Sequence, residues 1–298
     1  KTGGRDDLVM KKYRKAAVIL SVVLFASVLA IFLKKAEESA VPTETVRTAS
    51  ESGTKNREEI FCTVLGDSIA KGYSGDKSVW IECYGRIAVK QTAIDNGCRY
   101  KLRNYARNGL DTEKMNEEIL VRDDVLRSLE KSDIILISTG SNDLLNECKT
   151  VVQRILDMDT GFKSADQALA ELEERVKENP VLIFSVIDAL GKWDYHSFEK
   201  EWTEMMDTIA AVKRGDAGIV VNNIYNPAVG MNLPEPVSQA VGDIIQNMND
   251  IIDSHAEEYG YAVADLASSD VSAHVQSDGV HPDPEGQRII AEIVRDCL

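Results

Sequence analysis

A serine that follows the first apolar run of the outer part of the chain is the residue best placed to do chemistry. The run Phe61–Leu65 is partly β-branched and ends on Gly66, and Asp67 and Ser68 come next. Such a run predicts a buried strand, and open α/β sheets place their ligands just past the carboxyl ends of their strands. A hydroxyl there can attack a carbonyl carbon while backbone N–H groups stabilise the oxyanion. Alternatively, Asp67 or Ser68 only caps the helix that follows.

Three further polar turns occur farther along the chain. They are Asn108-Gly109, Gly140-Ser141-Asn142-Asp143 and Ser277-Asp278-Gly279-Val280-His281-Pro282. Because the carboxyl ends of parallel strands meet at one edge of a sheet, we expect the first two to lie close to the Ser68 turn. Together the four turns supply a nucleophile, oxyanion donors and an Asp/His pair, which favours catalysis over simple capping.

These turns resemble the sequence blocks of the SGNH/GDSL hydrolases. The stretch Asn222-Asn223-Ile224-Tyr225-Asn226-Pro227 is similar to the lysophospholipase-like branch of that family. The resemblance covers residues 60–298 and implies an α/β fold of three layers, α/β/α, with a five-stranded parallel, flavodoxin-like sheet. One departure is Ile69, which stands where the family has Leu, and this exchange of one apolar residue for another should be harmless.

The resemblance also implies a role for each residue of the site. Ser68 is the nucleophile, His281 is the general base, and Asp278 orients the imidazole. The backbone N–H groups of Ser68 and Gly109 and the side-chain amide of Asn142 form the oxyanion hole. A serine hydroxyl is a weak nucleophile, so a neutral imidazole must take its proton during the attack. This chemistry requires no metal and no other cofactor.

Nearby titratable residues have simpler interpretations. We expect Asp67 to brace its turn rather than act as an acid, and Asp283 to cap the last helix rather than bind a metal. His274 is either an ordinary loop residue or a residue that lines the pocket near His281.

Apolar runs alternate with helical segments along residues 60–298, which predicts a parallel sheet covered on both faces. The expected strands are 61–65, 99–105, 133–139, 217–224 and 261–266. The expected helices are 78–95, 111–129, most of 144–213, a long one that ends near 259, and 284–297. The apolar stretch 181–187 fits either a strand or, because Asn179-Pro180 precedes it, a helix.

The first 35 residues differ in composition from the rest. Residues 16–33 carry no charge, with Lys and Arg before them and two Lys residues after them. Eighteen helical residues cover roughly 27 Å, enough to cross a hydrocarbon core. A cleaved signal peptide is the alternative, but its apolar region is usually shorter. Most Lys and Arg precede the span, which predicts a cytoplasmic tail, residues 1–15, and an extracellular remainder of a single-pass protein of the cell membrane.

Residues 34–59 are polar and without periodicity, which predicts a flexible tether to the hydrolase domain, residues 60–298. Residues 1–35 hold eight of the 34 Lys and Arg residues and two of the 49 Asp and Glu residues. The rest of the chain therefore has 26 basic and 47 acidic residues, and its net charge is −21. Such a surface argues against a nucleic-acid partner. The five cysteines contain no C-x-x-C pair, which disfavours a zinc site or a disulfide framework.

The sequence therefore predicts a membrane-anchored, extracellular serine esterase. Its partners would be the membrane, through the N-terminal helix, and a small-molecule, lipid or glycan ester as substrate, with the acyl group passing through an acyl-enzyme. The alternative is a non-catalytic module of the same fold that binds or organises the cell envelope.

Overall fold

The computed structural model describes residues 58–158, 161–162, 165–227 and 235–298. The predicted tail, the predicted anchor and all but the last two residues of the predicted tether lie outside the described residues. Contacts divide the chain between residues 54 and 55, and every described residue belongs to the second unit, Lys55–Leu298. Within this described part, no helix combines the length and apolar character needed to cross a membrane.

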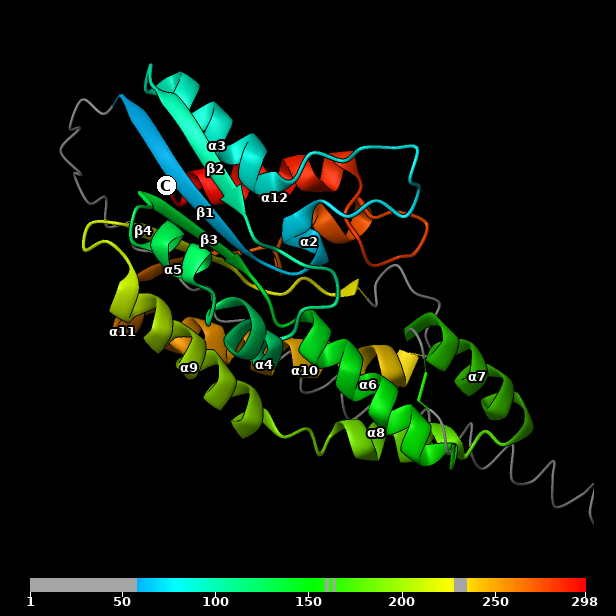
Figure 1. Ribbon diagram of the computed structural model, residues 1–298. Coiled ribbons are helices and arrows are strands. Elements are labelled where there is room, and N and C mark those ends of the chain that lie inside the picture. The colour runs from blue at the N-terminus through cyan, green and yellow to red at the C-terminus, as the bar shows by residue number, and fades with distance from the viewer. Residues whose placement is uncertain (1–57, 159–160, 163–164, 228–234) are drawn as a thin grey trace, which may run out of the picture. The chain divides into compact units, whose positions relative to one another are not determined.

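Five parallel strands form one sheet at the centre of this unit (Figure 1). They are β1 (Glu59–Gly66), β2 (Arg99–Asn104), β3 (Ile134–Ser138), β4 (Gly218–Asn222) and β5 (Tyr261–Ala264). Their order across the sheet is β2-β1-β3-β4-β5. All five predicted strands are present, and the inner strand β3 is buried along its whole length because each of its residues is covered on one face or the other.

One face of the sheet is covered by α3 (Tyr84–Asp95) and α12 (Pro284–Asp296), which pack against each other. Cys62 and Val64 of β1 belong to the fully buried core on this side. A Cβ atom added at Gly85 would lie 2.8 Å from a methyl carbon of Val64. The glycine therefore lets α3 approach β1 closely enough to seal this face.

Helices also cover the opposite face, so the three-layer α/β/α fold is confirmed. The elements nearest the sheet there are α5 (Asp123–Leu129), α9 (Tyr195–Val212), α10 (Glu235–Ser254) and α11 (Ala256–Tyr259). Farther out, α6 (Ser141–Ile155), α7 (Ala165–Glu178) and α8 (Leu182–Leu190) pack on one another and on α10. The apolar stretch that fitted either a strand or a helix thus lies in a helix, α8, which begins shortly after Pro180.

The predicted single helix over 111–129 is wrong. The segment forms α4 (Thr112–Lys114), a short π-helix, η1 (Met115–Ile119), and α5 after a break. Met115, Leu120 and Val125 are all buried. In one straight helix, at about 100° per residue, these three side chains would point in different directions, so the break allows all of them to reach the core.

The predicted helix over 78–95 begins later than expected, at Tyr84. A four-residue helix, α2 (Ser68–Lys71), follows β1 and ends at Gly72, whose φ of 75° suits glycine. A loop, residues 72–83, comes next, and Asp76 accepts hydrogen bonds from both the backbone N–H and the hydroxyl of Ser78. These bonds hold a turn where continuous helix was predicted. A single 3₁₀ turn, η3 (Asp270–Ala273), precedes the segment that carries Asp278.

Candidate active site

The turn between β1 and α2 places Ser68 at the carboxyl edge of the sheet, as predicted. Gly66 has a φ of 146°, and a Cβ atom there would lie 2.2 Å from the carbonyl oxygen of Ser138. Only glycine therefore allows β1 to turn this closely against β3. The N–H of Asp67 donates to the same Ser138 oxygen at 3.1 Å, which fixes the turn to the neighbouring strand.

Asp67 caps α2 and leaves the hydroxyl of Ser68 available. The Asp67 Oδ1 atom accepts the N–H of Ile69 at 2.9 Å. Burial raises the pKa of Asp67 to about 7; the N–H groups of Ile69 and Ala70 act against this rise, and the nearby Asp143 carboxylate adds to it. The capping alternative thus applies to Asp67, which braces the turn as predicted, and not to Ser68.

Ser68, His281 and Asp278 form one chain of hydrogen bonds. His281 Nε2 lies 2.9 Å from the Oγ of Ser68, a residue 213 positions away in sequence. His281 Nδ1 lies 2.7 Å from Asp278 Oδ2. With a proton on Nδ1 donated to Asp278, Nε2 is left to accept the proton of the serine hydroxyl.

Asp278 is held as a carboxylate by its own turn. Its Oδ1 accepts the backbone N–H groups of Val280 and His281, each at 3.0 Å. Partial burial raises the pKa of Asp278, but these two N–H groups and the His281 imidazole outweigh burial and bring the pKa below the usual value. A charged Asp278 can therefore orient His281 and stabilise the imidazolium.

Gln276 ties the segment that carries Asp278 and His281 to the loop after α2. Its Nε2 donates to the carbonyl oxygens of Tyr73, at 2.8 Å, and Pro282, at 3.0 Å. Its Oε1 accepts the N–H of Gly75 at 2.9 Å. The ring of Tyr73, in turn, lies against the His281 imidazole, with 4.4 Å between ring centroids. Gln276 thus positions both His281 and the ring of Tyr73 beside it.

Two other buried side chains form hydrogen bonds with the backbone next to Ser68 and His281. The hydroxyl of Tyr225 donates to the carbonyl of Val280, next to His281. Gln287 of α12 donates to the carbonyl of Ile69 at 3.0 Å and accepts the N–H of Tyr84 at 2.7 Å. Sequence reasoning missed Gln276, Gln287 and Tyr73 as positioning residues.

The turn that holds Gly109 lies against the turn that holds Ser68. The N–H of Arg107 donates to the carbonyl of Gly66 at 3.0 Å, and Gly109 has a φ of 74°. In the part of the chain that the structure describes, neither the Ser68 nor the Gly109 N–H donates to a protein acceptor. Both donors thus remain open for a ligand oxygen.

The third predicted oxyanion donor, Asn142, is at the start of α6 and reaches the same place. Its Nδ2 donates to the Leu110 carbonyl at 3.0 Å and lies 3.5 Å from Asp67 Oδ2. One of its two N–H bonds is therefore well used by Leu110, whereas the second makes only a long contact. The structure brings all the predicted site residues to one edge of the sheet.

A comparison with protein families agrees with this geometry. The family model described as GDSL-like Lipase/Acylhydrolase matches residues 63–294. The chain belongs to this family. It is a carboxylic ester hydrolase of the GDSL type, as its sequence blocks predicted. No curated protein matches this GDSL hydrolase significantly in sequence.

Solved structures share the fold of the GDSL hydrolase. The lipase Lip_vut3 from a goat rumen metagenome is 18% identical, with 80% of this chain and 97% of that chain covered and a TM-score of 0.55. An extracellular lipase from Streptomyces rimosus is 16% identical, with coverage of 81% and 100% and a TM-score of 0.54. Phospholipase A1 from Streptomyces albidoflavus NA297 is 16% identical, with coverage of 80% and 98% and a TM-score of 0.50.

In the GDSL hydrolase, hydrogen bonds of Asp143 connect the turn that carries Gly109 to the turn that carries Asn142. It accepts hydrogen bonds from the Thr112 N–H, at 3.2 Å, and from the Thr112 hydroxyl, at 2.5 Å. Burial raises the pKa of Asp143 to about 6, although the bonds from Thr112 act against the rise. The contact joins the start of α6 to the start of α4.

The remaining candidates of the GDSL hydrolase have structural roles. Asp283 Oδ1 accepts the N–H groups of Glu285 and Gly286, each at 2.8 Å, and so caps α12 as predicted. The carbonyl of His274 accepts the N–H of Asp283, and in the described residues no hydrogen bond joins His274 to Ser68 or Asp278. Among those residues no group of three or more His, Cys, Asp or Glu side chains is arranged to hold a metal. All five cysteines are unpaired.

Proposed function

We propose that this GDSL hydrolase cleaves its ester through an acyl-enzyme on Ser68. The observation that carries the proposal is the hydrogen-bonded chain of Ser68, His281 and Asp278 beside two open backbone N–H groups. In the first step His281 Nε2 takes the hydroxyl proton while Ser68 Oγ bonds to the carbonyl carbon. The carbonyl oxygen becomes an oxyanion, and Asp278 stabilises the imidazolium.

The oxyanion lies between the N–H groups of Ser68 and Gly109 and the second N–H of Asn142, which turns from its long contact with Asp67 toward the new charge. Each such donor contributes on the order of a hundred- to a thousand-fold in rate. The tetrahedral intermediate then breaks its C–O bond to the alcohol, which leaves with the proton from His281. Water, deprotonated by the same imidazole, attacks the acyl-enzyme and regenerates Ser68.

The substrate we propose is a lipid ester or an O-acyl group on a glycan of the cell envelope. The neighbours named as lipases and a phospholipase support a lipid ester. The apolar, uncharged run 16–33 supports anchoring in the cell membrane, with the hydrolase domain outside. Hydrolysis rates over esters graded by acyl length distinguish the two substrate classes, since a glycan deacetylase prefers acetyl and a lipase prefers long chains.

A fluorophosphonate probe tests the nucleophile directly, because it bonds covalently to an activated serine and releases fluoride. We expect the probe to label Ser68, and Ser68→Ala to lose both labelling and hydrolysis of an aryl ester. Ser277→Ala is the matched control, because Ser277 is exposed in the segment that carries His281. Labelling that persists in Ser68→Ala would show that the nucleophile is another residue. A folded protein that neither takes the label nor hydrolyses esters would instead be a non-catalytic module of the cell envelope.

A further inference from the structure

A groove of about 320 Å³ lies between the edge strand β2 and the helix α5. Phe61, on β1, and Tyr105, just past β2, form part of its lining. Four cationic side chains surround it, namely Lys101, Arg103, Arg127 and Lys131. None of these residues belongs to the site around Ser68, and the groove has no role in the mechanism above.

The charge of this groove is opposite to that of the molecule. Residues 36–298 carry a net charge of −21, as counted above. Nevertheless, among the residues that the structure describes, Lys101, Arg103 and Lys131 form no ion pair. Arg127 approaches Asp123 only at 3.7 Å, between two largely exposed side chains, and such pairs contribute little.

The one carboxylate in the lining is already engaged. Asp124 is held by Arg122, which donates to it at 2.8 Å and 3.1 Å. The guanidinium of Arg122 also lies over the ring of Tyr105, 5.5 Å from its centroid. Asp124 is therefore paired outside the group of four cations, and the groove keeps a strong positive charge.

Protection of the sheet edge does not explain this arrangement. Lys101 and Arg103 alternate with half-buried residues on β2, and exposed cations on an edge strand do prevent pairing with another chain. Arg127 and Lys131, however, come from α5 and the turn after it, which are not part of the edge. Half of the cations thus face the groove for another reason.

We propose that this groove binds an organic phosphate. Arginine guanidinium groups bind phosphate oxygens in pairs, and lysines add charge without a fixed geometry. The rings of Phe61 and Tyr105 offer apolar contact to the organic part of the ligand. A volume of about 320 Å³ suits a unit such as glycerol phosphate, at the small end of known ligand pockets. That unit occurs free, in polymers and in lipid headgroups.

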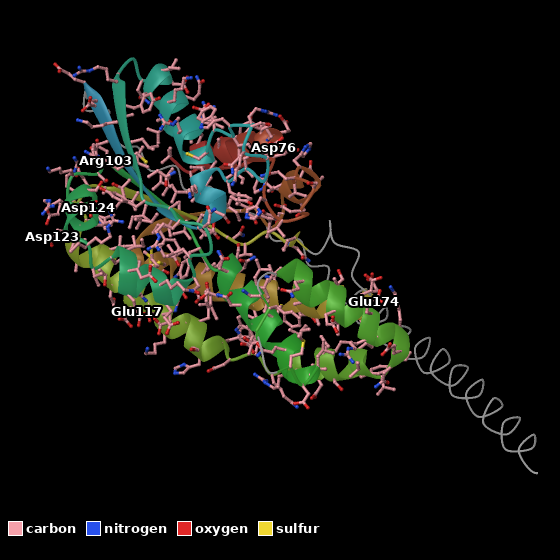
Figure 2. The ribbon with its side chains drawn as sticks, turned by 45° about the vertical axis from the view of Figure 1, so that its right-hand side comes forward. Asp76, Arg103, Glu117, Asp123, Asp124 and Glu174 are labelled. Carbon is pink, nitrogen blue, oxygen red and sulfur yellow. The ribbon has the colours of Figure 1, made fainter. Side chains whose placement is uncertain are left out.

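The groove is separate from the catalytic edge. Phe61 and Lys101 pair in the first half of β1 and β2, whereas Ser68 follows the carboxyl end of β1. In Figure 2, Arg103 and Asp124 lie on one side of the ribbon, and Asp76, in the loop that contacts His281 through Tyr73, lies on the other. Binding here can be measured without hydrolysis.

Calorimetry on the full chain in a non-ionic detergent tests the proposal, with inorganic phosphate and glycerol 3-phosphate as probes. We expect glycerol 3-phosphate to bind more tightly than phosphate, and both to weaken as salt is raised. Sedimentation with phosphatidylglycerol vesicles identifies a headgroup as the source if they bind more protein than phosphatidylcholine vesicles, which measure insertion of the apolar run 16–33 alone. No binding of either soluble probe below about 10 mM and no preference for anionic vesicles would overturn the proposal.

Two double variants with the same change of charge separate a site from general attraction. Lys101→Gln/Arg103→Gln removes one Lys and one Arg from the groove, and we expect binding at least about tenfold weaker. Arg86→Gln/Lys90→Gln removes the same charges from exposed positions of α3, on the other face of the sheet, and should bind as the parent does. Equal weakening in both variants would reject a defined site. Ester hydrolysis should be unchanged in both.

Discussion

Ser68 and His281 meet at 2.9 Å, but the molecule holds them by different means. Ser68 stands on a backbone turn between a central strand and a helix, locked by the close approach of Gly66 to Ser138. His281 stands in a segment outside the sheet and the helices. A short backbone pairing holds it, with the Gln276 N–H donating to the His281 carbonyl at 2.8 Å, and so do the side chains of Gln276, Asp278 and Tyr225. Ser68 thus depends on the sheet, whereas His281 depends on a short backbone pairing and on several side-chain hydrogen bonds.

This difference means that single side-chain changes should disturb the base more easily than the nucleophile. A backbone turn has few alternatives once the strands are paired, because its geometry is fixed by hydrogen bonds of the sheet. A segment held partly by side chains loses one of those restraints with each substitution while the fold survives. Three predictions test this comparison, and they are ordered by their expected effect on hydrolysis.

The largest effect is expected from Asp278→Asn. The substitution removes the charge that stabilises the imidazolium, and the amide can favour the wrong tautomer of His281. The equivalent change in a serine protease lowers kcat about ten-thousand-fold, but here the Asp278 turn also holds His281 through its backbone N–H. We therefore expect kcat to fall on the order of a hundred- to a thousand-fold, measured with a short aryl ester.

The control for this variant is Asp283→Asn, in the same segment, where an amide oxygen can still cap α12. It should retain most of the activity. A loss of less than about threefold in Asp278→Asn, with an unchanged melting temperature, would mean that the carboxylate does not assist His281 and that the side-chain restraint is unimportant.

The sequence predicted the rigid half of this comparison well. The strands stand out because buried parallel strands are continuous apolar runs, as in Ile134–Ser138. The turn at Gly66 and Ser68 follows from them, since a strand that ends on glycine and a polar residue must turn at the sheet edge. The roles of Asp278 and His281 came from the family resemblance, and their geometry fits those roles.

The restraints on the base could not be predicted in the same way. Gln276 contacts Gly75 across 201 residues, and no local pattern marks that pairing. Tyr225 was visible in the Asn-Asn-Ile-Tyr-Asn-Pro stretch, but its contact with Val280 depends on tertiary packing. The prediction of one continuous helix after Asp111 failed for a similar reason. The break in the helix depends on the burial of Leu120 in the tertiary structure, which helix periodicity does not reveal.

The second prediction concerns Gln276→Ala, which removes two hydrogen bonds to the loop after α2 and a third, to the Pro282 carbonyl, within the segment that carries His281. We expect kcat to fall about tenfold with a smaller change in KM, because small displacements of a catalytic group are costly. Gln246→Ala, on the exposed side of α10, is the matched control. If Gln276 serves only the stability of the fold, the melting temperature falls and kcat does not, which would contradict a positioning role.

The smallest effect on hydrolysis is expected from Asp67→Asn, on the rigid side of the comparison, and its main consequence is for stability. The amide oxygen can still accept the N–H of Ile69, so the turn is kept. Burial raises the pKa of Asp67 to about 7, so the folded protein binds a proton near pH 5 that the unfolded chain has largely lost. Ionisation of Asp67 in the folded state therefore lowers the stability of the parent protein as the pH rises from about 4 to 7.

Above pH 7 Asp67 is charged in both the folded and the unfolded state. The burial of its charge then destabilises the folded state to the full extent. The Asp67→Asn variant lacks this cost, so its free energy of unfolding should exceed that of the parent by about 2–4 kcal/mol more at pH 8 than at pH 4. Denaturant unfolding at both values measures the difference, with the exposed Asp123→Asn as control. Asp143, whose pKa is raised to about 6, adds a slope of the same sign in both proteins, so the difference between them reports chiefly on Asp67. A difference between the two proteins that is the same at both pH values would show that Asp67 ionises in the folded state as it does in the unfolded chain.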